Sequence, residues 1–374
     1  MTGALDGILV ADFSRVLAGP YATMLLADLG ATVIKVERPV LGDDTRAWGP
    51  PFTAEGKSTY FEGINRNKSS IILDLDNLRD RKRAMKLIAQ SDVMIENFKV
   101  GGLKRYGLDF TSVHATNEQL IYCSISGFGT GAGRDLPGYD LLVQAMGGLM
   151  SITGENTPTK VGVALVDVLT GLHATVAILA ALHERASSGR GQLIEVNLLS
   201  VLLASMVNQS AGFVLGGKVP SMMGNAHPSI APYELFQAQD RELIIAVGND
   251  HQFTQLMNTL DVPELALDAR FSSNSARVEN RLLLKAIIED KLRGRSAQEW
   301  HERFSAVGIP AGPINNLEQS FAFAESLGLN PIVGGQVASP LFLSRTPVSY
   351  NYSAPELGVN TQEIIESLDL DNPE

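Results

Sequence analysis

The chain of 374 residues is longer than one compact hydrophobic core usually supports, so two domains are expected. Its hydrophobic content of 45% and charged content of 19% are ordinary for a globular enzyme. The net charge of −11 argues against nucleic acid and acidic membrane surfaces as partners, because both are polyanions. Any anionic ligand must therefore be held by a local group of arginines and lysines.

The N-terminal segment and the cysteine count bear on the compartment. No basic stretch followed by an apolar one opens the chain, so no secretory signal is expected. The single cysteine, Cys123, excludes an internal disulfide framework and is typical of a reducing compartment. We therefore expect a cytoplasmic protein, with the Cys123 thiol inside a buried strand over 120–126.

Strands and helices alternate in the first half of the chain. Apolar runs predict buried strands at five places, namely 8–13, 31–37, 70–75, 92–97 and 120–126. A helix is predicted from Gly19-Pro20 to Leu29, with proline in the first turn where no donor is lost. This alternation predicts a mainly parallel, Rossmann-like α/β sheet covered on both faces. Ligands of such sheets bind at the carboxyl ends of the strands.

The pattern changes after about residue 200. A long helix is predicted over 196–216 and a loop rich in Gly, Met and Pro over 217–232. A hairpin over 234–247 is followed by three helices, at 251–260, 276–292 and 297–307. We expect a large domain, a linker, a smaller α+β domain and a C-terminal segment that returns to the large domain, over residues 1–200, 201–224, 225–325 and 326–374 respectively.

Asp167 is the most informative residue of the sequence. It lies in an apolar run that continues to Leu182, where a carboxylate is costly to bury unless it is paired or used. The run is long enough to suggest a membrane span, but Asp167, Thr170 and His173 interrupt it, which favours a buried helix of a soluble domain. The residue alone leaves two interpretations open: a helix cap or ion-pair partner, and a desolvated nucleophile.

Other motifs argue against bound cofactors. The glycines of 127–133 are spaced G-x-G-x-G-x-G rather than G-x-G-x-x-G, and Pro137 stands where a dinucleotide-binding helix should begin. We therefore expect no nicotinamide or flavin. The six histidines are scattered without a pair at helical ligand spacing, so no metal site is expected.

Nine short segments spread over almost the whole chain form a further pattern. They are 12–20 (DFSRVLAGP), 29–39 (LGATVIKVERP), 42–46 (GDDTR), 67–71 (NKSSI), 92–98 (DVMIENF), 167–171 (DVLTG), 191–196 (GQLIEV), 225–233 (NAHPSIAPY) and 308–313 (GIPAGP). In this order they resemble the family III CoA-transferases, which include formyl-CoA transferase and carnitine CoA-transferase. The resemblance implies ring-shaped chains interlocked as a homodimer.

The resemblance also implies substrates and residues. The substrates are an acyl-CoA and a carboxylic acid, and Asp167 falls at the family's nucleophilic aspartate, which forms an anhydride and then an aspartyl-CoA thioester. CoA is a polyanion, so placed arginines are needed to bind it. The implied CoA-binding residues are Val16, Ala18, Arg38, Leu73, Asn97, Phe98, Arg105 and Tyr106. The implied substrate-binding residues are Arg15, Leu17, Tyr139, Asp140 and Gly224.

Two departures bear on the substrate and on the reaction. Formyl-CoA transferase has a histidine and a glutamine where this chain has Arg15 and Leu17, which disfavours formate and oxalate. Arg15 could meet the distal carboxylate of a dicarboxylate such as succinate. The alternative reaction is that of alpha-methylacyl-CoA racemase, which keeps the aspartate but needs a second acid or base. Tyr139 replaces the racemase histidine, and a tyrosine side chain is in general too weak an acid to serve easily as a base at neutral pH.

A third hypothesis is a non-catalytic CoA-binding protein. The presence of Asp167 at the position of the family's nucleophile argues against it. We therefore expect a CoA-transferase.

Overall fold

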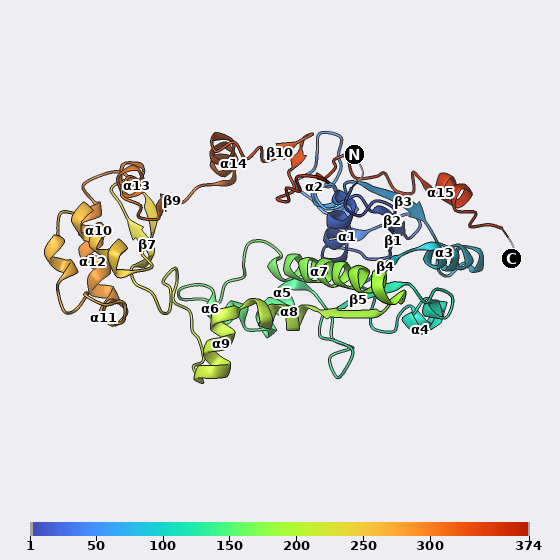
Figure 1. The fold of residues 1–374 in the computed structure, drawn as a ribbon, viewed down its shortest axis with the longest axis horizontal. Helices are drawn as coiled ribbons and strands as arrows, with labels where there is room; N and C mark the ends of the chain where they lie inside the picture. Colours follow the sequence, from blue (N-terminus) through green and yellow to red (C-terminus); the bar gives the residue numbers. More distant parts are fainter. Residues whose placement is uncertain (1–2, 373–374) are drawn as a thin grey trace. The chain divides into compact units, whose positions relative to one another are not determined.

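The computed structural model describes residues 3–372 and separates into two compact units (Figure 1). The first unit contains Met1–Leu149, Lys160–Val219 and Ile332–Glu374. The second contains Met150–Thr159 and Pro220–Pro331.

A six-stranded parallel sheet forms the centre of the first unit, in the order β3-β2-β1-β4-β5-β6. Its strands are β1 (Leu9–Asp12), β2 (Thr32–Glu37), β3 (Lys68–Ile72), β4 (Val93–Glu96), β5 (Ile121–Ser126) and β6 (Leu193–Asn197). The predicted parallel α/β sheet is confirmed, and the five predicted strands are present with ends shifted by a few residues. The sixth strand, β6, was not predicted. The strand order reverses between β1 and β4, which is the switch point of a doubly wound fold.

Helices cover both faces of this sheet. Successive strand residues point to opposite faces, so Val10 packs in one hydrophobic core and Ala11 in the other. The first core includes α1 (Ala18–Asp28), α7 (Leu165–Ser188) and α8 (Leu198–Ser205); the second includes α3 (Leu78–Gln90), α4 (Phe110–His114) and α15 (Thr361–Ser367). Helices α1 and α7 approach closely, because a Cβ on Gly171 would lie 2.7 Å from the Ala18 carbonyl oxygen.

By length and composition alone, helix α7 could cross a membrane, which is the alternative that its apolar sequence also suggested. Its inward face is fully buried against the sheet through Val166, Ala174 and Ile178, as in a core helix of an α/β protein. The prediction of one long helix over 196–216 is wrong. Two helices, α8 and α9 (Val207–Gly216), meet there at an angle of 82°, and Val207 leaves the helical region with φ 32°.

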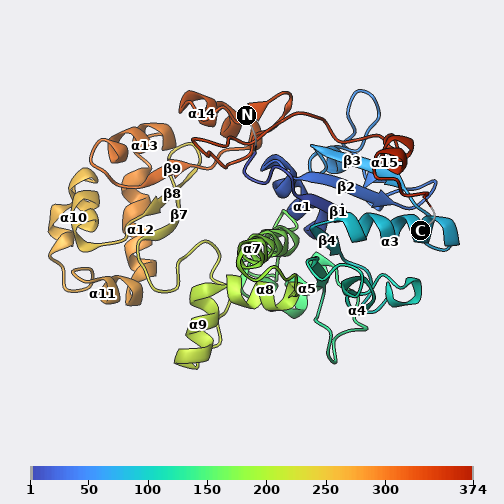
Figure 2. The ribbon, with the colours of Figure 1, turned by 45° about the vertical axis from the view of Figure 1, so that its right-hand side comes forward.

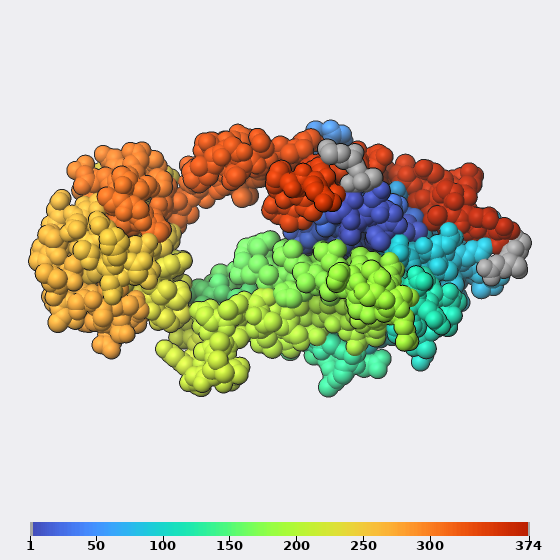
Figure 3. Space-filling view, in the orientation of Figure 1, coloured from blue at the N-terminus to red at the C-terminus, as the bar shows by residue number. Residues whose placement is uncertain are grey.

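Residues 332–372 belong to the first unit. They contain the short hairpin of β10 (Ile332–Val333) and β11 (Gln336–Val337) and, further on, α15. Residues 358–361 cover the free edge of β3, where the Asn360 N–H donates to Ser70 O and the Ile72 N–H donates to Thr361 Oγ1. Ile364 and Ile365 then enter the second hydrophobic core, together with residues of α3. Helix α15, which carries them, lies beside α3 in the ribbon (Figure 2), and the C-terminal segment is dark red in the space-filling view (Figure 3).

The second unit contains an antiparallel sheet of β7 (Tyr233–Gln237), β8 (Glu242–Ala246) and β9 (Ala311–Pro313). Phe236, Leu256 and Trp300 belong to its separate core. The hairpin over 234–247 is confirmed, whereas the helix predicted over 276–292 is broken at Asn280. The helices are α10 (Asp250–Thr259), α11 (Asn274–Glu279), α12 (Arg281–Leu292), α13 (Ala297–Ser305) and α14 (Leu317–Ser326).

Candidate active site

A cavity of about 400 Å³ lies at the carboxyl ends of β1, β4 and β5 in the first unit. The loops after these strands supply most of its wall, and Asp167 from the first turn of α7 completes it. The predicted residues that line it are Arg15, Val16, Leu17, Ala18, Asn97, Phe98, Tyr139 and Asp167. The cavity therefore occupies the switch point of the sheet, where ligands of this architecture bind.

The loops after β1 and β4 are locked together beside this cavity. The Asn97 side chain accepts a hydrogen bond from the Arg15 N–H at 2.9 Å and donates one to the Arg15 carbonyl at 2.6 Å. The Arg15 guanidinium lies 5.3 Å from the centre of the Phe98 ring. Its nearest carboxylate is Asp44, at 3.6 Å. Arg15 is therefore a half-exposed cation in the cavity wall, with a long ion pair to Asp44 and a cation–π contact with Phe98.

The capping interpretation of Asp167 is answered by a neighbouring carboxylate. Asp140, in the first turn of α5 (Asp140–Met146), accepts hydrogen bonds from the Val166 N–H at 2.8 Å and the Asp167 N–H at 3.3 Å. The Gln144 amide holds the other Asp140 oxygen at 2.6 Å. Asp140 thus satisfies the free N–H groups at the start of α7, whose own N-cap, Ala164, has no side-chain bond.

The carboxylate of Asp167 is left free in the cavity wall. Among residues 3–372, no side chain forms an ion pair or hydrogen bond with it. Partial burial, and secondly the nearby charge of Asp140, raise the pKa of Asp167 to about 7. Both causes disfavour the ionised form, so the carboxylate that does form is poorly solvated and correspondingly reactive.

In the protein without bound ligand, Asp167 is expected to lower the free energy of unfolding at neutral pH. An ordinary aspartate has a pKa of 3.8, and Asp167 has a pKa of about 7 in the folded protein. Between these two pH values the folded state therefore keeps a proton that the unfolded chain releases. The folded state loses stability as the pH rises through that window, and Asp167→Asn removes the loss. We expect a gain of at least about 1 kcal/mol at pH 8 and almost none at pH 4, from thermal unfolding. An equal gain at both pH values would contradict the raised pKa.

Sequence reasoning missed Tyr60, in α2 (Thr59–Glu62). Burial raises the pKa of Tyr60 to about 12, and the charges of Asp167 and Asp140 act in the same direction. The phenol therefore stays protonated near these carboxylates. No motif of the sequence covers Tyr60, and its electrostatic interaction with Asp140 and Asp167, 80 and 107 positions away, could not be predicted from the sequence.

The predicted CoA-binding arginines lie outside the cavity wall. Arg38 follows β2, where it pairs with Asp44 and donates to the Gly42 carbonyl at 3.0 Å. Arg105, in the short helix Lys104–Tyr106, lies over the Tyr106 ring at 4.4 Å and is largely exposed. Leu73 and Tyr106 are buried. The cations of the wall besides Arg15 are Lys99, which pairs with Asp135 at 3.0 Å, and Arg134.

The other predicted substrate residues occupy different settings. Tyr139 precedes α5 and is 64% exposed, while Asp140 binds the start of α7. Gly224 belongs to the second unit, where its N–H donates to the Gly154 carbonyl at 3.0 Å. The role of Gly224 stays a prediction from the family resemblance. Within residues 3–372, no three His, Cys, Asp or Glu side chains gather as a metal ion would require.

Removing the charge of Arg38 or of Arg105 is expected to weaken CoA binding. Both guanidinium groups are exposed enough to bind a phosphate. The gain is reduced because Arg38 must first break its ion pair with Asp44, and because Arg105 stays partly hydrated. We therefore expect a loss of about 1–2 kcal/mol for Arg38→Gln and for Arg105→Gln, measured by calorimetry with CoA. Arg79→Gln is a matched control, because Arg79 is an exposed arginine paired with Asp371. Both variants binding CoA as tightly as the control would disprove the assignment.

A doubly wound sheet with a polar cavity at its switch point and a free carboxylate in the wall defines a ligand-binding site of enzyme type. The family model described as CoA-transferase family III matches residues 5–361, so the chain belongs to this family. The succinate–glutarate CoA-transferase of Agrobacterium fabrum is 43% identical over 98% of this chain and 96% of its own length.

Two further relatives extend the comparison. The succinyl-CoA:glutarate CoA-transferase of Mus musculus is 40% identical over 97% of this chain and 86% of its own length. The crystal structure of a CaiB/BaiF family protein from Brucella suis superposes with a TM-score of 0.89 at 43% identity, covering 99% of this chain and 100% of that one. The predicted family is confirmed over nearly the full chain.

Proposed function

We propose that this enzyme transfers CoA from succinyl-CoA to a dicarboxylic acid such as glutarate, through a covalent intermediate on Asp167. The observation that carries the proposal is the free Asp167 carboxylate in the cavity wall, relieved of any capping role by Asp140. The names of the relatives at 43% and 40% identity support this choice of acids. The half-exposed Arg15 in the same wall supports a second carboxylate on the substrate.

The proposed reaction begins when a carboxylate oxygen of Asp167 attacks the thioester carbonyl. The carbon–sulfur bond breaks, a succinyl-aspartyl anhydride forms and the CoA thiolate leaves with the electron pair. The thiolate then attacks the aspartyl carbonyl, which gives an aspartyl-CoA thioester and free succinate. The second acid repeats both steps in reverse, so the enzyme is regenerated and no water is consumed.

The residues of the cavity fit these steps. Poor solvation makes the ionised Asp167 a strong nucleophile, and its ionised fraction grows as the pH rises through about 7. Arg38, Arg105, Lys99 and Arg134 supply positive charge for the CoA phosphates around an otherwise acidic protein. Water must be excluded from the anhydride, because hydrolysis would waste the thioester.

The test is a matrix of acyl-CoA donors against carboxylic acids, read by mass spectrometry. Succinyl-CoA with glutarate should give glutaryl-CoA and succinate in equal amounts, at rates that depend on both substrates. The racemase reaction is tested in parallel with a 2-methylacyl-CoA in deuterated water. Alpha-deuterium incorporation without acyl exchange to any acid would overturn the proposal in favour of the racemase.

We further propose a homodimer, with interlocked chains as the family resemblance implies. Exposed apolar side chains support a covered surface, among them Val214 and Leu215 in α9 and Phe342, which is 89% exposed. Light scattering at decreasing concentration should show a constant dimer mass, because unlinking two rings requires unfolding a chain. A compact monomer that binds CoA would disprove the linked arrangement.

A further inference from the structure

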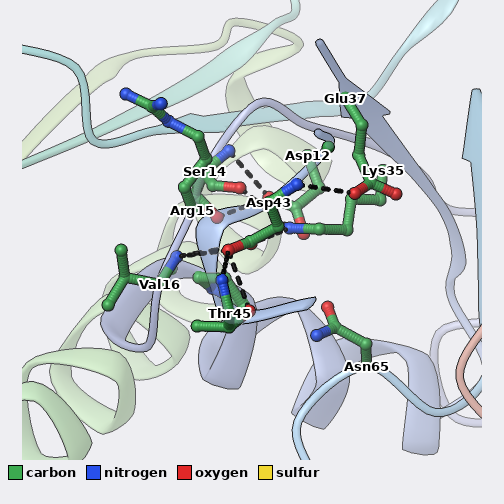
Figure 4. Close-up of polar contacts among 12 residues, drawn as sticks. Asp12, Ser14, Arg15, Val16, Lys35, Glu37, Asp43, Thr45 and Asn65 are labelled. Atoms are coloured by element: carbon green, nitrogen blue, oxygen red, sulfur yellow. Dashed lines mark hydrogen bonds and ion pairs between the residues drawn. The ribbon is translucent and has the colours of Figure 1, made fainter. Parts of the chain in front are cut away.

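The loop after β1 is fixed by side chains rather than by a regular turn. The Ser14 N–H donates to Asp12 Oδ1 at 2.9 Å, and Asn97 binds both backbone groups of Arg15. Two more contacts come from the buried ion pair of Lys35 and Asp43. Figure 4 shows Asp12, Lys35 and Asp43 beside the loop of Ser14, Arg15 and Val16. Since Arg15–Ala18 line the cavity, whatever sets this loop also sets the cavity wall.

Val16 in this loop has an unfavourable backbone conformation. Its φ is 71°, in the left-handed region, where a β-branched residue is a steric outlier. Such a conformation persists only when the surrounding structure imposes it. The Val16 N–H lies 3.3 Å from each oxygen of the Asp43 carboxylate (Figure 4). Asp43 is thus the side chain placed to impose it.

Asp43 is one half of a fully buried ion pair with Lys35. The Lys35 Nζ lies 2.9 Å from Asp43 Oδ2, and both side chains have no exposed surface. The same ammonium donates to the Ser14 carbonyl at 3.0 Å. The pair therefore holds the loop at two points, the ammonium on Ser14 and the carboxylate on Val16.

Both groups of the pair are charged. Burial alone would raise the pKa of Asp43, but Lys35 and the hydrogen bonds from Thr45 hold it below its usual value. Burial would likewise lower the pKa of Lys35, and the charge of Asp43 raises it instead. A buried ion pair stabilises a fold little compared with an apolar pair of the same shape. Its contacts with the loop point to a different use.

We propose that the Lys35–Asp43 pair is a positioning device, which holds Val16 in its left-handed conformation and so sets the backbone of residues 16–18 beside Asp167. Neither Lys35 nor Asp43 lines the cavity. A relaxed φ at Val16 would redirect Leu17 and Ala18, and a misplacement of about 1 Å in a reacting geometry costs roughly 100-fold in rate. The inference rests on the proposed function only for its kinetic readout.

The test is a double-mutant cycle between Asp43 and Val16. Asp43→Asn keeps the shape and removes the charge that holds Val16, so we expect kcat/KM to fall by roughly 10- to 100-fold. Glycine adopts a positive φ without strain, so Val16→Gly in the Asp43→Asn background should restore about tenfold of the loss. Val40→Gly is the matched control, because Val40 has φ 68° but is 87% exposed and lies outside the cavity wall.

Recovery by Val16→Gly and not by Val40→Gly supports the proposal, whereas no recovery, or equal recovery by both, overturns it. A purely structural role would lower the melting temperature without this selectivity. If Asp43→Asn does not fold, Lys35→Met/Asp43→Asn removes both buried charges and replaces it in the cycle. CoA affinity from calorimetry gives a second readout with the same expectations. If the wild type binds CoA but transfers none, the proposed function is refuted. The positioning role of the Lys35–Asp43 pair is then tested by the CoA affinities of the same variants.

Discussion

Asp167→Asn is expected to lower the rate of CoA transfer by at least about 10⁴-fold, as loss of a covalent nucleophile does in other enzymes. An amide cannot form the anhydride, so no residual path through a covalent intermediate remains. Affinity for CoA should change by less than about threefold, since the arginines proposed to bind the phosphates are unchanged. Steady-state transfer assays and calorimetry measure the two quantities on the same preparation.

A control and a pH profile sharpen this expectation. Asp135→Asn alters another carboxylate of the cavity wall, one that is exposed and paired with Lys99, and should retain at least about a tenth of the rate. In the wild type, kcat/KM should fall as the pH drops below about 7, because the nucleophile becomes protonated. Hydroxylamine should trap an adduct on Asp167 during turnover. Transfer by Asp167→Asn at near the wild-type rate would refute the mechanism.

Arg15→Leu is expected to lower kcat/KM for dicarboxylate acceptors by roughly 10- to 100-fold, the range for losing a charge-assisted bidentate contact. Monocarboxylate acceptors should change little. The physical reason is that Arg15 lies in the cavity wall, half-exposed and paired with Asp44 at a long 3.6 Å, so its guanidinium can meet a second carboxylate. Parallel assays with glutarate and butyrate measure the ratio.

Arg15→Lys separates charge from geometry in the same assay. Lysine keeps the positive charge but cannot make two parallel hydrogen bonds, so it should recover only part of the dicarboxylate preference. If Arg15→Leu loses both classes of acceptor equally, Arg15 contacts CoA or a neighbouring acid and is not the selector. That outcome would leave the role of Asp167 unaffected.

The strands buried at the centre of the sheet could be predicted, because parallel strands covered on both faces are continuous apolar runs. The edge strand β6 was missed because Glu195 interrupts its short apolar run, and the strand is exposed enough to carry a charged residue. The break between α8 and α9 could not be predicted either, because the sequence carries no helix-breaking residue there. It falls at Met206 and Val207, and neither glycine nor proline marks it.

The candidate site was predictable in part for a different reason. A carboxylate in an apolar run singled out Asp167, and the ordered motifs gave it a role. What the sequence could not reveal was pairing across long separations. Asp140 binds N–H groups 26 and 27 residues away, and Asp43 reaches back 27 residues to Val16. Such contacts depend on which strand ends become neighbours, and single residue types do not record that.

The covering of β3 by residues 358–361 has a consequence for synthesis on the ribosome. The free edge of β3 is hydrogen-bonded by the Asn360 and Thr361 side chains, and Ile364 and Ile365 fill the core behind it. All core residues of the second unit leave the ribosome well before Asn360, Thr361, Ile364 and Ile365 do. A nascent chain can therefore complete its smaller unit while the larger one still exposes an unpaired strand edge. Until residues 358–365 are available, that edge is open to misassociation and to chaperones.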